Sequence, residues 1–217
     1  MLPESFISRR SILLGATATL LSPACGASSP PPDRMRRRAR ADLYACEGCE
    51  GAREAPAAGI DWQARIAAPD EPGERLRIVG IVFQPDGRTP APGVIVYAYH
   101  TDAAGLYSRG TPATEWSRRH GLLRGWVGTG ADGRYAFDTV KPAMYPNRSD
   151  PAHVHLTILE PGRRPYWIDD IVFAGESRVD DSYRRKREDR GGSGIVSLDR
   201  QGTAWLARRD IVLEPHP

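Results

Sequence analysis

Short apolar-rich runs, several of which alternate apolar and polar residues, dominate the chain after its first 40 residues. Successive side chains of a β-strand point to opposite faces, so this alternation predicts strands that are buried on one face. Turn sequences such as Pro-Asp-Gly at 85–87 and Ala-Asp-Gly at 131–133 separate the runs. The pattern predicts an all-β fold, a β-sandwich of two packed sheets with long loops and little helix. The predicted strands cover residues 76–83, 94–100, 125–129, 135–138, 153–159, 168–173 and 204–213, with one short charged helix over 182–189.

The chain divides into three predicted segments. Residues 1–26 are typical of a twin-arginine export signal, because the run SRRSILL at 8–14 opens an apolar stretch too short to span a bilayer. Residues 27–64 combine a Pro- and Arg-rich linker with a CxxC segment. Residues 65–217 are expected to form one domain with a sizeable core. We therefore expect an exported protein of the periplasm or cell envelope.

Three cysteines add to this picture. Cys25 ends the run LSPAC at 21–25, which resembles a bacterial lipoprotein cleavage site, so a lipid tether through Cys25 is one interpretation and ordinary cleavage or an uncleaved anchor is the other. Cys46 and Cys49 form a CxxC pair. A local disulfide is the expected state in an oxidising compartment, with a redox or metal-binding pair as the alternative. No second cysteine pair is present to complete a zinc site.

The positive charge of the chain lies at its N-terminal end. Residues 1–40 carry seven Arg and two acidic residues, a net charge of +5, whereas the remainder carries 23 basic and 25 acidic residues, a net charge of −2. The predicted domain is therefore near neutral. Nucleic-acid binding has no electrostatic support, and we expect no nucleic-acid partner.

The pair His153 and His155 carries the clearest chemical signal. Two residues at i and i+2 on a strand point the same way, so the two imidazoles can converge on one metal ion. Tyr145 and Tyr107 lie upstream, and phenolate oxygen suits a hard ion such as Fe(III). An HxH pair is more often a pair of half-buried histidines, and a tyrosine in a β-rich chain is more often a core aromatic. Spacing alone does not select iron.

Longer motifs narrow the choice. The runs LRGWVGTGADGRYAF at 123–137, KPAMYP at 141–146 and PAHVH at 151–155 follow in this order, preceded by GERL at 73–76 and AAGLY at 103–107 and followed by DIVL at 210–213. In this order they resemble the intradiol ring-cleavage dioxygenases, and most closely the protocatechuate 3,4-dioxygenase branch. The resemblance covers roughly residues 65–217 and agrees with the predicted β-sandwich.

The resemblance implies a site and an activity. Tyr107, Tyr145, His153 and His155 would hold a non-haem Fe(III), and Tyr145 would also be catalytic, leaving the metal and taking a proton from the substrate. The substrate would be a catechol-type aromatic diol, cleaved by O2 between its two hydroxylated carbons. The chain would therefore be an exported dioxygenase of aromatic catabolism. A homo-oligomer is an open option.

Several positions depart from the family pattern. Asp150 stands where the family has an Arg three places before the first His, and Arg148 is the expected substitute as a catalytic residue. Asp170 aligns with a family Gln, and Asn147 replaces an aromatic. These changes favour an alternative, an envelope β-sandwich of weak or no activity that binds metal or a catecholate ligand. Retention of all four presumed ligands favours the enzyme over this binder and over a purely structural domain.

Other residues have structural interpretations. Tyr97 and Tyr99 alternate onto one strand face and are expected to pack in the core rather than to line a pocket. Arg124 is expected to pair with a carboxylate near the site. His120 lacks a ligand context and is expected at the surface or in the core, and His216 is expected to fray at the C-terminus.

Overall fold

The computed structural model describes residues 38–57, 59–108 and 114–217. The predicted export signal, Cys25 and the start of the Arg-rich run lie outside these residues. In the described residues, no helix is both long enough and apolar enough to cross a membrane. The elements of the first sheet are β1 (Gln63–Arg65), β2 (Arg75–Phe83), β5 (Arg134–Val140), β9 (Leu198–Gln201), β10 (Ala204–Arg208) and β11 (Ile211–Val212). Those of the second are β3 (Ile95–His100), β4 (Arg124–Gly128), β6 (His153–Leu159), β7 (Tyr166–Phe173) and β8 (Ile195–Val196).

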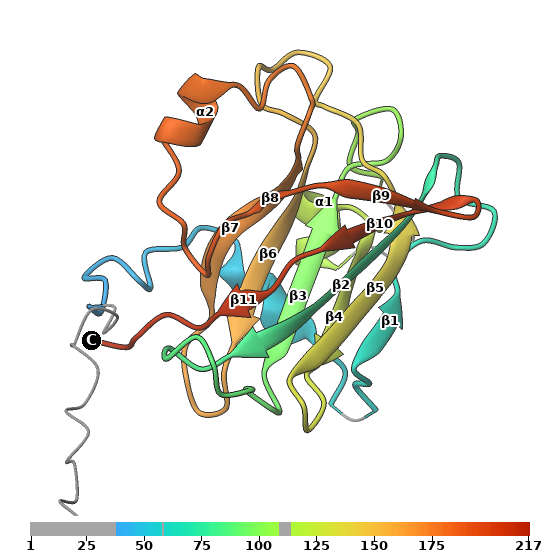
Figure 1. The fold of residues 1–217 in the computed structure, drawn as a ribbon. Helices are drawn as coiled ribbons and strands as arrows, with labels where there is room; N and C mark the ends of the chain where they lie inside the picture. The colour runs from blue at the N-terminus through green and yellow to red at the C-terminus, as the bar shows by residue number, and fades with distance from the viewer. Residues whose placement is uncertain (1–37, 58, 109–113) are drawn as a thin grey trace, which may run out of the picture. The chain divides into compact units, whose positions relative to one another are not determined.

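The strands form two mixed sheets, as Figure 1 shows. The first has the order β1-β5-β2-β10-β9, with β11 continuing beside β2, and the second has the order β4-β3-β6-β7-β8. Strands β3, β4, β6 and β7 pair antiparallel, which is the usual arrangement in sandwiches. The predicted all-β sandwich with little helix is confirmed.

Alternation along the strands places the core between the sheets. In β6, Val154, Leu156 and Ile158 are buried, and each contributes about 1.5–3 kcal/mol by leaving water. His153 and His155 are half-buried on the opposite face of the same strand. The pattern that builds the core therefore also sends both histidines to the outer face of the second sheet.

Two predicted elements differ in detail. The strand predicted over 204–213 is divided into β10 and β11 at residues 209 and 210. There the Ile81 N–H donates to the Asp210 carboxylate at 2.9 Å, and the Arg209 side chain is buried, 1% exposed. The charged helix predicted over 182–189 is α2 (Asp181–Arg185), which begins where the Asp180 carboxylate accepts from the Tyr183 N–H at 2.8 Å. Two short helices had no sequence signal, α1 (Glu115–His120) and the 3-10 helix η1 (Cys49–Glu54).

The chain segment before residue 65 packs against the sandwich. Leu43 is fully buried in the core, and η1 contacts β3 and β6. The segment 27–64, predicted as linker and CxxC region, therefore contains residues that belong to the folded unit. Cys46 and Cys49 are joined in a disulfide, the state expected for them.

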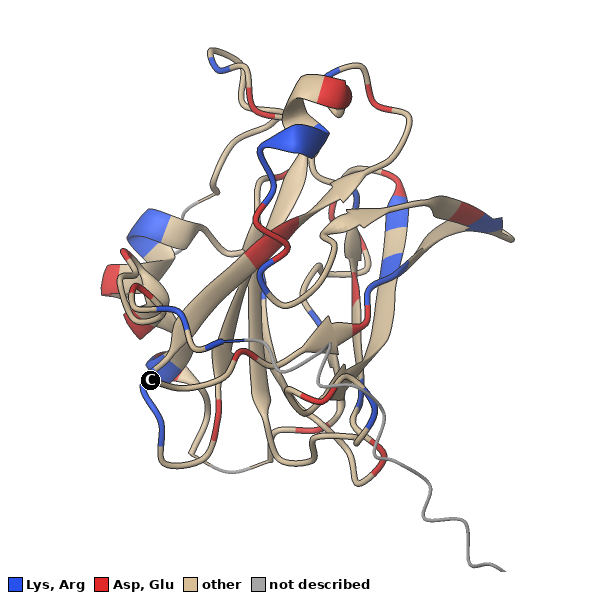
Figure 2. Ribbon diagram, turned by 60° about the vertical axis from the view of Figure 1, so that its left-hand side comes forward, with Lys and Arg blue, Asp and Glu red and all other residues tan. Residues whose placement is uncertain are grey.

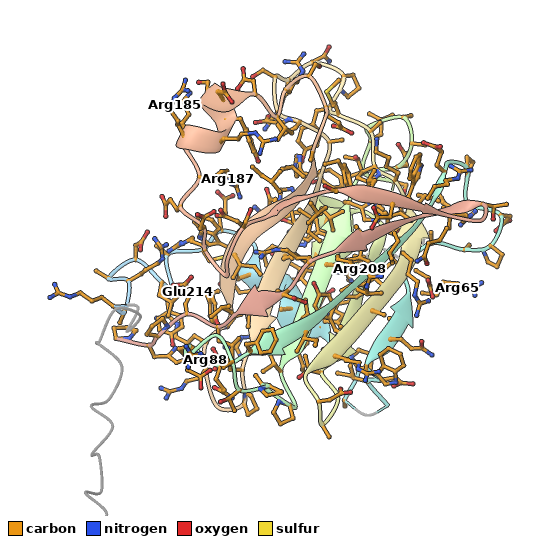
Figure 3. The ribbon with its side chains drawn as sticks, viewed as in Figure 1. Arg65, Arg88, Arg185, Arg187, Arg208 and Glu214 are labelled. Atoms are coloured by element: carbon orange, nitrogen blue, oxygen red, sulfur yellow. A yellow bond between two sulfur atoms is a disulfide. The ribbon has the colours of Figure 1, made fainter. Side chains whose placement is uncertain are left out.

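The C-terminus is held in place. His216 Nδ1 is hydrogen-bonded to the Tyr44 hydroxyl at 2.7 Å, and His216 Nε2 lies 2.9 Å from Glu160 Oε1. The prediction that His216 frays is therefore wrong. The buried carboxylate of Glu214, labelled in Figure 3, accepts from the Gly191 N–H at 2.8 Å and from Arg40 Nε at 3.2 Å. In Figure 2 acidic and basic segments are interspersed over strands and loops.

Candidate metal and active site

Two loops and one strand bring the predicted ligands together. Tyr107 follows β3, and Tyr145 lies in the connection from β5 to β6, which carries His153 and His155. The two loops touch at Gly105, which has φ of 78°, and a Cβ there would lie 2.0 Å from the Met144 carbonyl oxygen. Only glycine allows this approach. It sets the two phenols side by side over the outer face of β6.

The four predicted ligand atoms converge. The hydroxyls of Tyr107 and Tyr145 are 2.6 Å apart, and the Nε2 atoms of His153 and His155 are 3.0 Å apart. Tyr107 Oη lies 3.0 Å from His155 Nε2, and Tyr145 Oη lies 3.3 Å from both Nε2 atoms. The structure thus brings together all four residues that the sequence singled out.

The second nitrogen of each imidazole fixes its tautomer. His153 Nδ1 lies 2.7 Å from the Pro151 carbonyl, which can only accept, and His155 Nδ1 lies 3.1 Å from Asp170 Oδ1. Each Nδ1 therefore carries the proton, and both Nε2 lone pairs point into the same space. Two facing lone pairs repel unless a cation or a proton lies between them. The donor set, two imidazole nitrogens and two phenol oxygens, fits a small hard cation of high charge.

Asp170 reaches His155 through an irregularity in the sheet. Between the pairs Val154↔Ile171 and Leu156↔Ile168, β7 has one residue more than β6. Such a bulge redirects a side chain, and here it turns Asp170 to the outer face. Asp170 belongs to a group with both histidines whose ligand atoms lie within 4.8 Å. Because its carboxylate faces Nδ1, on the far side of the His155 ring from Nε2, it is placed to orient the ring rather than to bind the ion.

The residue that precedes Asp170 is also ionic. The buried carboxylate of Asp169 pairs with Arg187, with Nε at 3.1 Å and Nη2 at 2.9 Å. Arg187, labelled in Figure 3, follows α2, so this pair ties the α2 segment to β7 beside Asp170. It anchors the bulge that presents Asp170.

The protein alone favours the uncharged forms of Tyr107, Tyr145 and His153. Burial raises the pKa values of the Tyr107 and Tyr145 hydroxyls and, reinforced by His155, lowers the pKa of His153. Burial opposes ionisation of Asp170, but its electrostatic contact and hydrogen bond with the His155 ring outweigh burial and hold the Asp170 pKa below its usual range. Deprotonated phenols in this site therefore need a positive charge from outside the protein.

The two charged residues before the histidines are both exposed. The Arg148 guanidinium lies over the Tyr145 ring at 5.4 Å from its centroid, a cation–π contact. Asp150 is close enough to raise the pKa of Tyr145. Arg148 is therefore in contact with one of the predicted ligands, and its role as the substitute for the family's Arg stays a prediction.

Some residues that contact the predicted ligands had no signal in the sequence that pointed to this role. Tyr99 stacks on His155 with centroids 4.5 Å apart, and it was predicted only as a core aromatic. Its pairing opposite His155 in the β3–β6 ladder could have been inferred only from the register. Arg124, predicted to pair with a carboxylate, binds Glu54.

A family model and individual relatives match this chain. A family model described as Dioxygenase matches residues 52–190. The chain is 29% identical over 153 residues to chlorocatechol 1,2-dioxygenase of Rhodococcus opacus, covering 63% of this chain and 58% of that protein. It is 35% identical over 112 residues to catechol 1,2-dioxygenase 1 of Acinetobacter lwoffii, covering 51% and 35%. The chain thus spans about half the length of such relatives.

A solved structure agrees. The dioxygenase domain of a dioxygenase carbohydrate-binding protein fusion from Streptomyces sp. SirexAA-E superposes with a TM-score of 0.54 at 26% identity, covering 74% of this chain and 94% of that one. The fold and the donor set define a β-sandwich with a candidate metal site. The family match identifies the class of protein: the chain belongs to the intradiol ring-cleavage dioxygenases, a family that uses non-haem iron.

Proposed function

We propose that this chain is a non-haem Fe(III) intradiol dioxygenase that cleaves a catechol-type ring between its two hydroxylated carbons. The observation that carries the proposal is the convergence of two Nε2 lone pairs and two phenol oxygens. Tyr145 Oη and His155 Nε2 each lie within 3.3 Å of the other three atoms. When bound there, Fe(III) supplies a Lewis acid and a template that brings the aromatic diol and O2 together.

The residues of the chain have distinct roles in this proposal. Tyr107, Tyr145, His153 and His155 hold the ion. Tyr145 Oη lies within 3.3 Å of the other three ligand atoms, and as the phenolate that a bound cation would stabilise it would take one proton from the incoming substrate.

Two residues beside the proposed ligands affect the charge of the bound diol and the orientation of a ligand ring. Arg148 stays over the Tyr145 ring and offsets negative charge on the diol. Asp170 holds the Nδ1 proton of His155, so that its Nε2 stays free to bind.

Oxygen consumption tests this function. Protein loaded with Fe(III) is given catechol, 3,4-dihydroxybenzoate and 4-chlorocatechol, with resorcinol as a meta-diol control. With ortho-diols we expect O2 uptake and a product with muconate-type absorbance, with one O2 consumed for each product molecule formed. With resorcinol we expect neither. Tyr135→Phe, which removes a hydroxyl bonded to Arg209 in the other sheet, serves as the matched tyrosine control. Stoichiometric iron binding with no O2 uptake for any diol would instead identify a binding protein.

We also propose that the enzyme works after export. The twin-arginine run at 8–14 and the disulfide between Cys46 and Cys49 both support an oxidising compartment. Cys25 is the proposed tether to the membrane. Fractionation of cells that express the full chain, compared with Arg9→Lys/Arg10→Lys, tests the route: the parent should reach the envelope and the variant should stay in the cytoplasm.

A further inference from the structure

The CxxC segment has no role in the proposed chemistry, yet it lies beside the site. We call residues 46–54 the knuckle; it comprises the Cys46–Cys49 disulfide and η1. Cys49, Gly51 and Ala52 are buried, so the knuckle is packed rather than attached loosely. The family model begins at residue 52, so most of the knuckle lies outside the matched region.

The knuckle packs closely against the His120 ring. A Cβ built on Gly48 would lie 3.0 Å from His120 Nε2, and one built on Gly51 would lie 3.0 Å from both Cε1 and Nδ1 of the same ring. The imidazole therefore rests against glycine backbone with no space between them. Its Nδ1 lies 2.8 Å from the Tyr97 hydroxyl, which fixes the ring in its plane.

His120 passes this contact on to a proposed ligand. Its ring stacks on Tyr99 with centroids 3.8 Å apart and planes 7° apart, and Tyr99 stacks on His155 at 4.5 Å and 25°. Tyr99 is also the cross-strand partner of His155 in the β3–β6 ladder. A continuous stack of rings thus runs from the knuckle to His155.

The stack supplies a restraint that the hydrogen bond lacks. The Asp170 contact at Nδ1 holds the His155 ring at one edge, whereas the tilt of the ring out of its plane is limited by what touches its face. Contact of Tyr99 with the ring face limits that tilt and sets the direction of Nε2. Two restraints, at an edge and at a face, determine where the lone pair points.

The knuckle is anchored at both ends and borders the site directly. Glu47 pairs with Arg119 at 2.7 Å, Glu54 pairs with Arg124, and the Trp126 indole donates to the Ala52 carbonyl at 3.1 Å. A cleft of about 290 Å³ lies between the knuckle and the site, lined by Cys46, Gly48, Tyr99, Trp167, His155 and Asp170 among others.

We propose that the disulfide-pinned knuckle is a positioning element for His155, acting through His120 and Tyr99. The consequence for iron rests on the proposed function, whereas the order of the His155 ring does not. The positioning residues are Gly51, His120 and Tyr99, and none of them is among the proposed ligands. The disulfide keeps the backbone of the knuckle against His120.

The first experiment uses metal-free protein with 13C-labelled histidine. The Cε1–Hε1 signal of His155 is expected to be single and sharp in the parent and in Tyr99→Phe, which keeps the ring. It should broaden or shift in Tyr99→Leu, in Gly51→Ala and in Cys46→Ser/Cys49→Ser. Tyr135→Leu, which removes a buried ring from the first sheet, should leave it unchanged. If the cysteine variant does not fold, Tyr99→Leu and Gly51→Ala decide. A His155 signal that is the same in both as in the parent overturns the proposal.

The second experiment measures release of Fe(III) to a chelator. Loss of the stack should speed release by about tenfold or more, as for other groups that orient a ligand, with Tyr99→Phe close to the parent. Equal release from the parent and Tyr99→Leu overturns the consequence for iron. If neither protein binds iron while the His155 signal responds as expected, the proposed function fails and the positioning stands.

Discussion

Acid should destabilise this domain through His100. This side chain lies at the end of β3 and is 1% exposed. Its Nδ1–H donates to the Thr101 carbonyl at 2.7 Å, and its Nε2 accepts from the Thr139 hydroxyl at 2.7 Å. The neutral ring is therefore fully satisfied, and burial lowers its pKa to about 4 from an ordinary value of 6.5.

This pKa shift sets the size and the sign of the pH effect on the free energy of unfolding. Between pH 6.5 and pH 4 the unfolded chain binds a proton at His100 that the folded chain does not bind. The stability associated with the neutral ring is fully present above pH 6.5 and is lost progressively as the pH falls toward 4. A gap of about 2.5 pKa units corresponds to about 3 kcal/mol of unfolding free energy.

Urea unfolding at pH 7.5 and pH 4.5, followed by circular dichroism, measures this effect. The parent is compared with His100→Gln, which keeps a donor and an acceptor but takes up no proton. Other titrating groups contribute equally to both proteins, so the parent should lose about 2–3 kcal/mol more than the variant between the two pH values. The same loss in both proteins, to within about 0.5 kcal/mol, would show that His100 is not the responsible group.

Three further predictions concern the site and its scaffold. Asp170→Asn keeps an oxygen near His155 but removes the charge, so Fe(III) affinity measured by chelator competition should fall about 10–100-fold; an unchanged affinity would exclude Asp170 as an orienting group. Tyr145→Phe removes the proposed proton acceptor, and its kcat for catechol should fall by about 10² or more although iron still binds; a kcat like that of the parent would contradict this role. Gly80→Ala places a Cβ 2.0 Å from the Arg209 carbonyl oxygen and should cost about 1–3 kcal/mol or more in urea unfolding; an unchanged midpoint would mean that the backbone yields freely.

Local patterns predicted the strands well because alternation is set by burial on one face. The strand predicted over 153–159 is β6 itself, with His153 and His155 together on its outer face. The convergence of Tyr107 and Tyr145 on them was not a local property and came from resemblance to a family. It depends on the close approach of two loops at Gly105.

Other features depend on tertiary register and were not predictable from the pattern. The bulge that turns Asp170 toward His155 exists only once β6 and β7 pair. The knuckle reads as loop sequence because its contacts are glycine backbone against His120, which leaves no hydrophobic periodicity. The last predicted strand is divided at Arg209, whose side chain is buried although its polarity argues against burial.

The most direct test of the central claim is an anomalous-difference map of crystals loaded with Fe(III) and soaked with a catechol. We predict one iron peak among Tyr107, Tyr145, His153 and His155, bonded to both Nε2 atoms, with Arg148 near the bound diol. A peak bonded to Asp170 with both phenol oxygens turned away, or no peak at this place, would contradict the proposed site.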